Sequence, residues 1–262
     1  MDQYSPDYVW FDFGLEFIND LYQRKFLTYY HNVADKNNQK IVVSYKWNHL
    51  PVGTGLVDVE QGRFNEATYH DWITDTTIDA GEAWGYMKDA KYKTAKELIH
   101  YLIDNVSKNG YLLLNVGPKP DGTIPEEAER VLLDMGEWLQ EYGEAIYDTE
   151  PWRAAEEGPT KMIGSGAFSE MNDVTYTERD IRYTMHDQDI YAIALGKVGD
   201  KVTLNKIFPM VYENEIDSIQ MLGEDRNLTW IREGDQLIIL TTGMKKNEIA
   251  NVFRITRREW CH

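Results

Sequence analysis

The sequence of 262 residues contains a single cysteine, Cys261, next to the C-terminus. An intrachain disulfide is therefore excluded, and so is a zinc site built from several cysteine thiolates. No apolar run approaches the ~18 residues of a membrane span. Residues 1–6 form neither a basic nor an apolar segment, so the sequence predicts no secretory signal and a cytoplasmic protein.

Basic side chains are also scarce. The chain has 27 Lys and Arg against 44 Asp and Glu, which gives a net charge of −17. Such a chain repels phosphate and anionic lipid, so we expect neither a nucleic acid nor a membrane surface as partner. Aromatic residues, in contrast, make up 13% of the chain, with 8 Trp and 17 Tyr. Aromatic faces suit a sugar-binding cleft, and a tryptophan-rich core is the alternative explanation.

The first 150 residues alternate between strands and helices. Strands are predicted at 7–11, 41–45, 55–60, 74–78 and 111–116, and helices at 16–35, 94–108 and 125–143. Thr94 and Glu97 have the spacing of a capping box at the start of the second helix. Strands and helices that alternate with short loops indicate parallel strands, so residues 1–150 are predicted to form an α/β domain.

The pattern changes near residues 147–152. From there on, only short alternating runs occur, at 180–183, 190–195, 201–204, 216–221, 228–231, 236–240 and 252–255. Turn residues separate these runs, so residues 151–262 are predicted to form an antiparallel β-sandwich domain.

Two carboxylates follow strands of the α/β domain. Asp12 lies at the end of the first strand, before Gly14, and Glu60 ends the third, before Gly62. Catalytic side chains collect at the carboxyl ends of parallel strands, and a glycosidase needs two carboxylates there. One attacks the anomeric carbon or activates water, and the other donates a proton. The alternatives are a loop aspartate that caps a helix and a surface glutamate beside Arg63.

Several motifs resemble glycoside hydrolase family 29, the α-L-fucosidases. They cover most of residues 1–152 and are Pro6-Asp7-x-x-Trp10-x-Asp12-x-Gly14, Ala83-Trp84-Gly85-Tyr86, the 112–117 strand with Pro118, Asp121 and Gly122, and Gly143-Glu144-Ala145-Ile146-Tyr147 before Pro151-Trp152. The resemblance implies a (β/α)8-like barrel followed by a β-sandwich. It also implies hydrolysis of fucosylated glycans or glycosides with retention, through a covalent fucosyl-enzyme and without a cofactor.

The resemblance also implies roles for individual residues. Asp12 matches the nucleophile. Glu60 is the preferred acid/base, while Glu66 and Glu82 remain rivals and Asp58 a more distant one. The family's acid/base lies in a stretch of variable length, so a motif is not enough to identify this residue in the sequence.

Three further residues match positions near the sugar. Trp10 and Trp84 match an apolar wall beside the methyl group of fucose, with ordinary core residues as the alternative. Lys46 falls near a position where some members carry arginine. It would hold the charge of the nucleophile or contact a sugar hydroxyl, and a solvated surface lysine is the alternative. Lysine does not clamp a carboxylate bidentately as arginine does.

The chain departs from the family in one respect. A (β/α)8 barrel takes roughly 250 residues, and about 150 precede the predicted sandwich here. We therefore expect an incomplete barrel of about five strands, truncated at its N-terminal side. The six histidines, His31, His49, His70, His100, His186 and His262, do not replace by motif the histidines that the family supplies there. His49 and His70 lie in loops near the candidate site.

Three functions remain open on the sequence alone. The first is a retaining α-L-fucosidase. The second is a non-catalytic carbohydrate-binding or scaffold remnant, and the third a glycosidase of other specificity. No histidine, cysteine and carboxylate cluster has metal-ligand spacing, so no metal is expected.

An incomplete barrel also has consequences for association. It exposes an inner face, expected to carry Val9, Ile41, Val43, Leu112 and Leu114, so we predict a homo-oligomer that forms through this face. The alternative is a monomer in which the sandwich or the 46–56 and 61–73 loops cover the gap.

Overall fold

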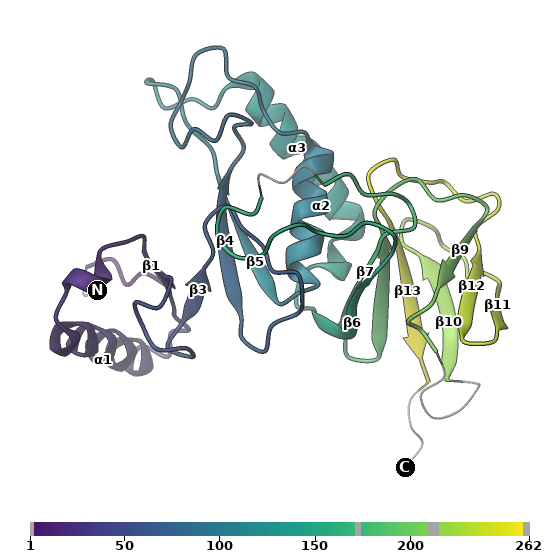
Figure 1. Ribbon diagram of the computed structural model, residues 1–262, viewed down its shortest axis with the longest axis horizontal. Helices are drawn as coiled ribbons and strands as arrows, with labels where there is room; N and C mark the ends of the chain where they lie inside the picture. Colours follow the sequence, from purple (N-terminus) through teal and green to yellow (C-terminus); the bar gives the residue numbers. More distant parts are fainter. Residues whose placement is uncertain (1–2, 171–173, 209–214, 259–262) are drawn as a thin grey trace.

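The computed structural model describes residues 3–170, 174–208 and 215–258, so Cys261 and His262 lie outside the described residues. The chain is extended, with α1 (Asp20–Lys36) and β1 (Tyr8–Phe11) at one end and the strands of the C-terminal half at the other (Figure 1). Within the described ranges, no helix has the length and apolar character needed to cross a membrane.

Five parallel strands form the first sheet. They are β1, β2 (Val42–Lys46), β3 (Leu56–Asp58), β4 (Trp72–Thr77) and β5 (Gly110–Asn115). They lie in chain order and each pair is parallel, which confirms the predicted partial barrel. All carboxyl ends therefore meet at one edge of this curled sheet, and this arrangement positions the site.

The helices begin where their caps place them. Asn19 accepts a hydrogen bond from the Leu21 amide and starts α1, after the short helix η1 (Leu15–Phe17). This explains why α1 starts later than the predicted residue 16. The predicted Thr94–Glu97 capping box is confirmed at α2 (Ala95–Val106). The third helix, α3, covers Glu126–Tyr142 and follows Pro125.

The apolar side chains of the sheet face the helices. Val9, Ile41 and Val43 belong to a cluster with Tyr30 of α1. Leu114 packs in the cluster built around α2 and α3. The prediction that these residues line the open inner face was therefore wrong, because the strand alternation places them on the covered side.

Leu112 follows the same alternation. It lies in register with Thr74, whose hydroxyl is hydrogen-bonded to Tyr101 of α2, so it also belongs to the helix-covered side. The inner face instead carries Tyr8 and Trp10, whose side chains reach Ser44 on the adjacent β2 and Asp58 on β3. Polar and aromatic residues thus line the barrel interior.

The C-terminal half contains two antiparallel sheets, with orders β10-β13-β8-β7-β6 and β11-β12-β9. Their strands are β6 (Glu150–Glu157), β7 (Ile181–His186), β8 (Asp189–Ala194), β9 (Lys201–Leu204), β10 (Ile216–Met221), β11 (Trp230–Glu233), β12 (Gln236–Leu240) and β13 (Asn251–Arg257). A common apolar core joins the sheets, as a β-sandwich requires. Strand β6 was not predicted, because its start had been taken as the boundary between the two regions.

The two halves share a core. The cluster that holds Leu98 of α2 and Trp138 of α3 also contains Tyr191, Ile193 and Val252 of the sandwich. The helices α2 and α3 therefore lie between the parallel sheet and the sandwich (Figure 1).

Candidate functional site

The carboxyl ends of β1 to β4 converge on Lys46. This lysine ends β2, and its side chain is only 1% exposed. Its Nζ lies 2.8 Å from Asp75 Oδ1, 3.1 Å from Glu60 Oε2, 3.3 Å from Asp58 Oδ2 and 3.8 Å from Asp12 Oδ1. One ammonium group therefore contacts four carboxyl groups, and the predicted alternative of a solvated surface lysine was wrong.

The strand register explains this convergence. Lys46 is paired with Asp58 across β2 and β3, and Asp58 with Ile73 across β3 and β4. Asp75 lies two residues beyond Ile73 and so points to the same face of the sheet. Asp12 follows β1 directly.

The four carboxyl groups form an outer and an inner pair. The side chains of Asp12 and Glu60 are 47% and 24% exposed, whereas those of Asp58 and Asp75 are 0% and 5% exposed. Since Asp12 Oδ1 and Glu60 Oε2 contact the same Nζ atom, they lie no farther apart than about 6.9 Å, the sum of the two distances. This upper limit on the Asp12–Glu60 separation lies within the ~5–9.5 Å range found for the two carboxyl groups of glycosidases.

The inner pair has unusual electrostatics. Burial, together with the neighbouring Asp58 carboxyl, raises the pKa of Asp75 to about 6. Burial alone would lower the pKa of the Lys46 ammonium, but the hydrogen bond with Asp75 and the charge of Asp58 outweigh it and raise that pKa. Lys46 therefore remains charged while Asp75 titrates.

The two tryptophans are partly exposed. Trp10 is 39% exposed, donates from Nε1 to Asp58 Oδ2 at 2.6 Å, and has its ring 5.4 Å from Lys46 Nζ. Trp84 is 40% exposed, and its carbonyl accepts a hydrogen bond from Asn115 at the end of β5. Neither residue belongs to an ordinary core, and both present an aromatic surface to solvent.

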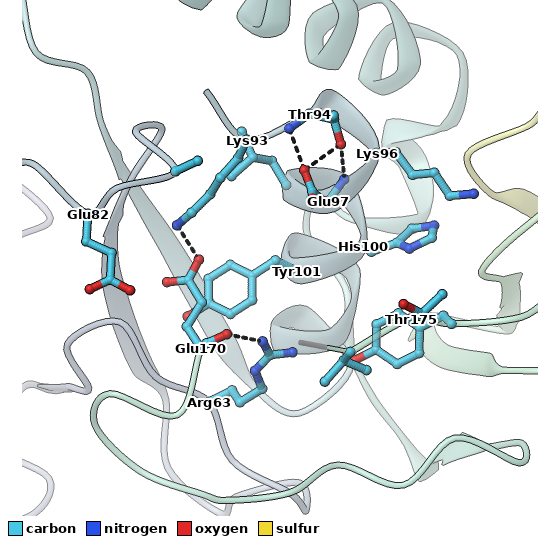
Figure 2. Close-up of a pocket in the computed structure, with 14 residues that line it drawn as sticks. Arg63, Glu82, Lys93, Thr94, Lys96, Glu97, His100, Tyr101, Glu170 and Thr175 are labelled. Carbon is cyan, nitrogen blue, oxygen red and sulfur yellow. Dashed lines mark hydrogen bonds and ion pairs between the residues drawn. The ribbon is translucent and has the colours of Figure 1, made fainter. Parts of the chain in front are cut away.

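The rival glutamates lie elsewhere. Glu66 is exposed in the connection between β3 and β4. Glu82 has a positive φ of 65° and lines a cavity of about 700 Å³ beside α2 (Figure 2). In the part of the chain that the structure describes, neither contacts Lys46, whereas Glu60 and Asp58 do.

Arg63 also lines the cavity in Figure 2. Its side chain points into this cavity, where its guanidinium donates to the Glu170 carbonyl at 3.3 Å and stacks 5.0 Å from the Tyr101 ring. Lys93 forms an ion pair with the Glu170 carboxylate there. The alternative interpretation of Glu60 as a surface glutamate beside Arg63 was therefore wrong, because Glu60 contacts Lys46 instead.

Sequence reasoning missed Asp75. The available signal in the sequence was the run of four polar residues Thr74-Asp75-Thr76-Thr77 within a predicted strand. In the structure this run is fully buried in β4. Such a run inside a strand indicates a hydrogen-bonded network rather than an apolar core. Of the loop histidines, His49 is 3.2 Å from Glu16, and His70 is exposed.

Four carboxyl groups at one point would suit a divalent cation, but the Lys46 ammonium occupies that point. Among the described residues, no group of three or more His, Cys, Asp or Glu is arranged to hold a metal ion. The neutralising charge at this site therefore comes from lysine.

Comparison with known proteins shows the family of the chain. The family model described as alpha-L-fucosidase matches residues 1–144. Plasma alpha-L-fucosidase of Rattus norvegicus is 31% identical over 87% of this chain and 47% of its own length. The Homo sapiens plasma enzyme is 30% identical over 88% of this chain and 47% of its own length.

Solved structures give the same result. The alpha-fucosidase of Thermotoga maritima in complex with fucose superposes with a TM-score of 0.72 at 25% identity, over 97% of this chain and 53% of that one. The chain thus spans about half the length of the relatives that it matches. With the family model matched from residue 1 to residue 144, the chain belongs to the alpha-L-fucosidase family.

Proposed function

We propose that this chain supplies the catalytic carboxylates of a retaining α-L-fucosidase, with Asp12 as the nucleophile and Glu60 as the acid/base. The observation that carries the proposal is the pair of contacts that Lys46 Nζ makes, 3.8 Å to Asp12 and 3.1 Å to Glu60. These two are the solvent-accessible members of the cluster, so a sugar can approach them from the open side.

The chemistry would proceed in two steps. The Asp12 carboxylate attacks the anomeric carbon of the fucosyl group while Glu60 donates its proton to the leaving oxygen, which departs as an alcohol. Glu60, now a carboxylate, then takes a proton from water. The resulting hydroxide equivalent attacks the anomeric carbon, releases fucose and restores the Asp12 carboxylate.

The surrounding residues support these roles. We assign Trp10 and Trp84 to an apolar wall beside the methyl group of fucose, since both expose about two fifths of their surface. For Lys46 we favour stabilisation of the Asp12 carboxylate over contact with a sugar hydroxyl, because its side chain is buried. The substrate would be a fucosylated glycan or glycoside.

The test is hydrolysis of 4-nitrophenyl α-L-fucoside by the wild type and by Asp12→Asn. We expect turnover by the wild type, nearly complete loss in the variant, and trapping of Asp12 as an ester by a 2-fluoro-fucosyl fluoride. A labelled peptide without Asp12 would overturn the nucleophile assignment. Turnover only of other nitrophenyl glycosides would indicate another specificity, and binding without any turnover a non-catalytic protein.

A further inference from the structure

The cluster around Lys46 contains an electrostatic conflict. A nearby ammonium group favours the ionised form of a carboxyl group. That suits Asp12, which must be ionised to attack, but opposes Glu60, which must carry a proton to act as an acid. Lys46 contacts both, and its Nζ is closer to Glu60 than to Asp12. Something else in the cluster has to offset the lysine charge at Glu60.

Building on the proposed function, we propose that the buried Asp58 and Asp75 act as positioning residues that hold the Lys46 ammonium and thereby keep the acid/base Glu60 in its proton-carrying form. Neither residue touches the substrate in this arrangement. They act only through Lys46 and through their own charge.

The geometry supports this assignment. Of its four carboxyl contacts, Lys46 makes the shortest, 2.8 Å, with Asp75, and this contact is also a hydrogen bond. Asp58 Oδ2 lies 3.3 Å from the same Nζ and is itself fixed by Trp10 Nε1 at 2.6 Å. Since both carboxyls are buried, water does not screen them from the lysine.

The charge of Asp75 depends on pH. Asp58 and Asp75 contact the same Nζ atom, so their carboxyl groups lie close together. Burial and the neighbouring Asp58 carboxyl raise the pKa of Asp75 to about 6. Asp75 therefore adds a negative charge beside Lys46 as the pH rises through about 6.

This added charge acts on Glu60 because Asp75 and Glu60 contact the same Lys46 ammonium. A protonated Asp75 leaves more of the lysine charge to favour an ionised Glu60. An ionised Asp75 offsets that charge and opposes a further negative charge on Glu60. The groups that face Asp75 are Tyr8 from β1, Lys46 from β2 and Asp58 from β3. Its register partner on β5 is Leu113, which does not titrate.

The test is Asp75→Asn, which keeps the shape and the hydrogen-bonding capacity of a protonated Asp75 but never gains its charge. We expect the alkaline limb of the kcat/KM profile to move to lower pH by roughly 0.5 to 1 unit. On the acid side of about pH 6, where wild-type Asp75 carries its proton, the two profiles should coincide. Asp71→Asn, an exposed aspartate just before the same strand, is the matched control and should leave the profile unchanged.

A second measurement does not depend on turnover. In protein with 13C-labelled glutamate carboxyls, the Glu60 signal is identified by its loss in Glu60→Gln, and its titration midpoint should fall in Asp75→Asn. If the midpoint falls but no fucoside is hydrolysed, the proposed function fails and the coupling stands. An unchanged midpoint in folded Asp75→Asn would overturn the inference, whether or not the enzyme is active.

Discussion

Arg182 of β7 donates from Nε to Asp104 Oδ1 of α2 at 2.5 Å, and so links the sandwich to a helix of the parallel sheet. Lys108 adds a second cation 3.0 Å from Asp104 Oδ1 and also contacts Glu156 of β6. The side chains of Asp104, Arg182 and Lys108 are at most 2% exposed. The junction between the two halves thus contains a buried ionic network as well as an apolar core.

We predict that Asp104→Asn destabilises the fold strongly. The change leaves Arg182 and Lys108 buried with only Glu156 as a carboxylate partner, and breaking such a pair costs about 3–5 kcal/mol. Urea unfolding measures the effect. Asp134→Asn, at an exposed position of α3, is the control and should change stability by less than about 0.5 kcal/mol. Equal stabilities of the two variants would show that the network does not stabilise the junction.

The same network predicts how stability depends on pH. Burial alone would raise the pKa of Asp104, but the charges of Arg182 and Lys108 outweigh it and lower the pKa to about 2. The stabilisation is therefore complete above the unfolded pKa of 3.8 and is lost as the pH falls through about 2. Urea midpoints measured from pH 5 to pH 2 should fall in the wild type, and fall less in Asp104→Asn. If the urea midpoints of the wild type and Asp104→Asn fell equally with pH, the pH dependence would not come from Asp104.

The acid/base assignment predicts chemical rescue. Glu60→Ala should lose most of its turnover, and azide, which needs no base to activate it, should restore activity on a substrate with a good leaving group. The product should be a fucosyl azide that retains the anomeric configuration of the substrate, because azide attacks the covalent intermediate, in which that configuration is already inverted. Glu66→Ala and Glu82→Ala are matched controls and should retain turnover without azide. Rescue in either of them instead would move the role to that residue.

Much of this fold follows from local sequence signals. The capping box Thr94–Glu97, the strand ends at Asp12 and Glu60, and the change to short alternating strands are each determined by a few neighbouring residues. Such signals survive in the structure because nothing at long range opposes them. They predicted that Asp12 and Glu60 lie at one edge of the sheet, whereas the interest in Lys46 came from the resemblance to the family.

What the sequence did not show depends on long-range pairing. Val43 and Leu114 were predicted on the open face, because an apolar strand does not reveal which side a helix covers. Asp75 was overlooked because its importance comes from the register of β3 and β4, which brings it to Lys46. Strand β6 begins at Glu150 and was hidden by Pro151, since proline usually marks a boundary.

We predict that turnover does not require a metal ion. Two carboxyl groups and water suffice for the chemistry, and the charge that a cation would supply is provided by Lys46. Dialysis against EDTA should therefore leave the rate of fucoside hydrolysis unchanged. Loss of the rate in EDTA, with recovery on addition of one divalent ion, would contradict the prediction.

The last prediction concerns self-association through the open face of the parallel sheet. In the described part of the chain, β1 and β5 each pair with only one strand, so each presents a row of unpaired backbone groups. The inner face beside them exposes Tyr8 and Val42, and Tyr111 of β5 is half exposed. Burying apolar side chains of this size contributes ~1.5–3 kcal/mol each, which favours a second copy as the cover.

Light scattering at micromolar concentration should therefore give a multiple of 30.5 kDa. Val42→Lys should shift the equilibrium towards the monomer, because it places a charge on the inner face. Leu133→Lys is the control, since Leu133 is an even more exposed apolar residue on α3, away from this face. If the copies complete each other's sugar pocket, specific activity should fall on dilution in parallel with the mass. A wild-type particle of 30.5 kDa with undiminished activity would exclude this role for the open face.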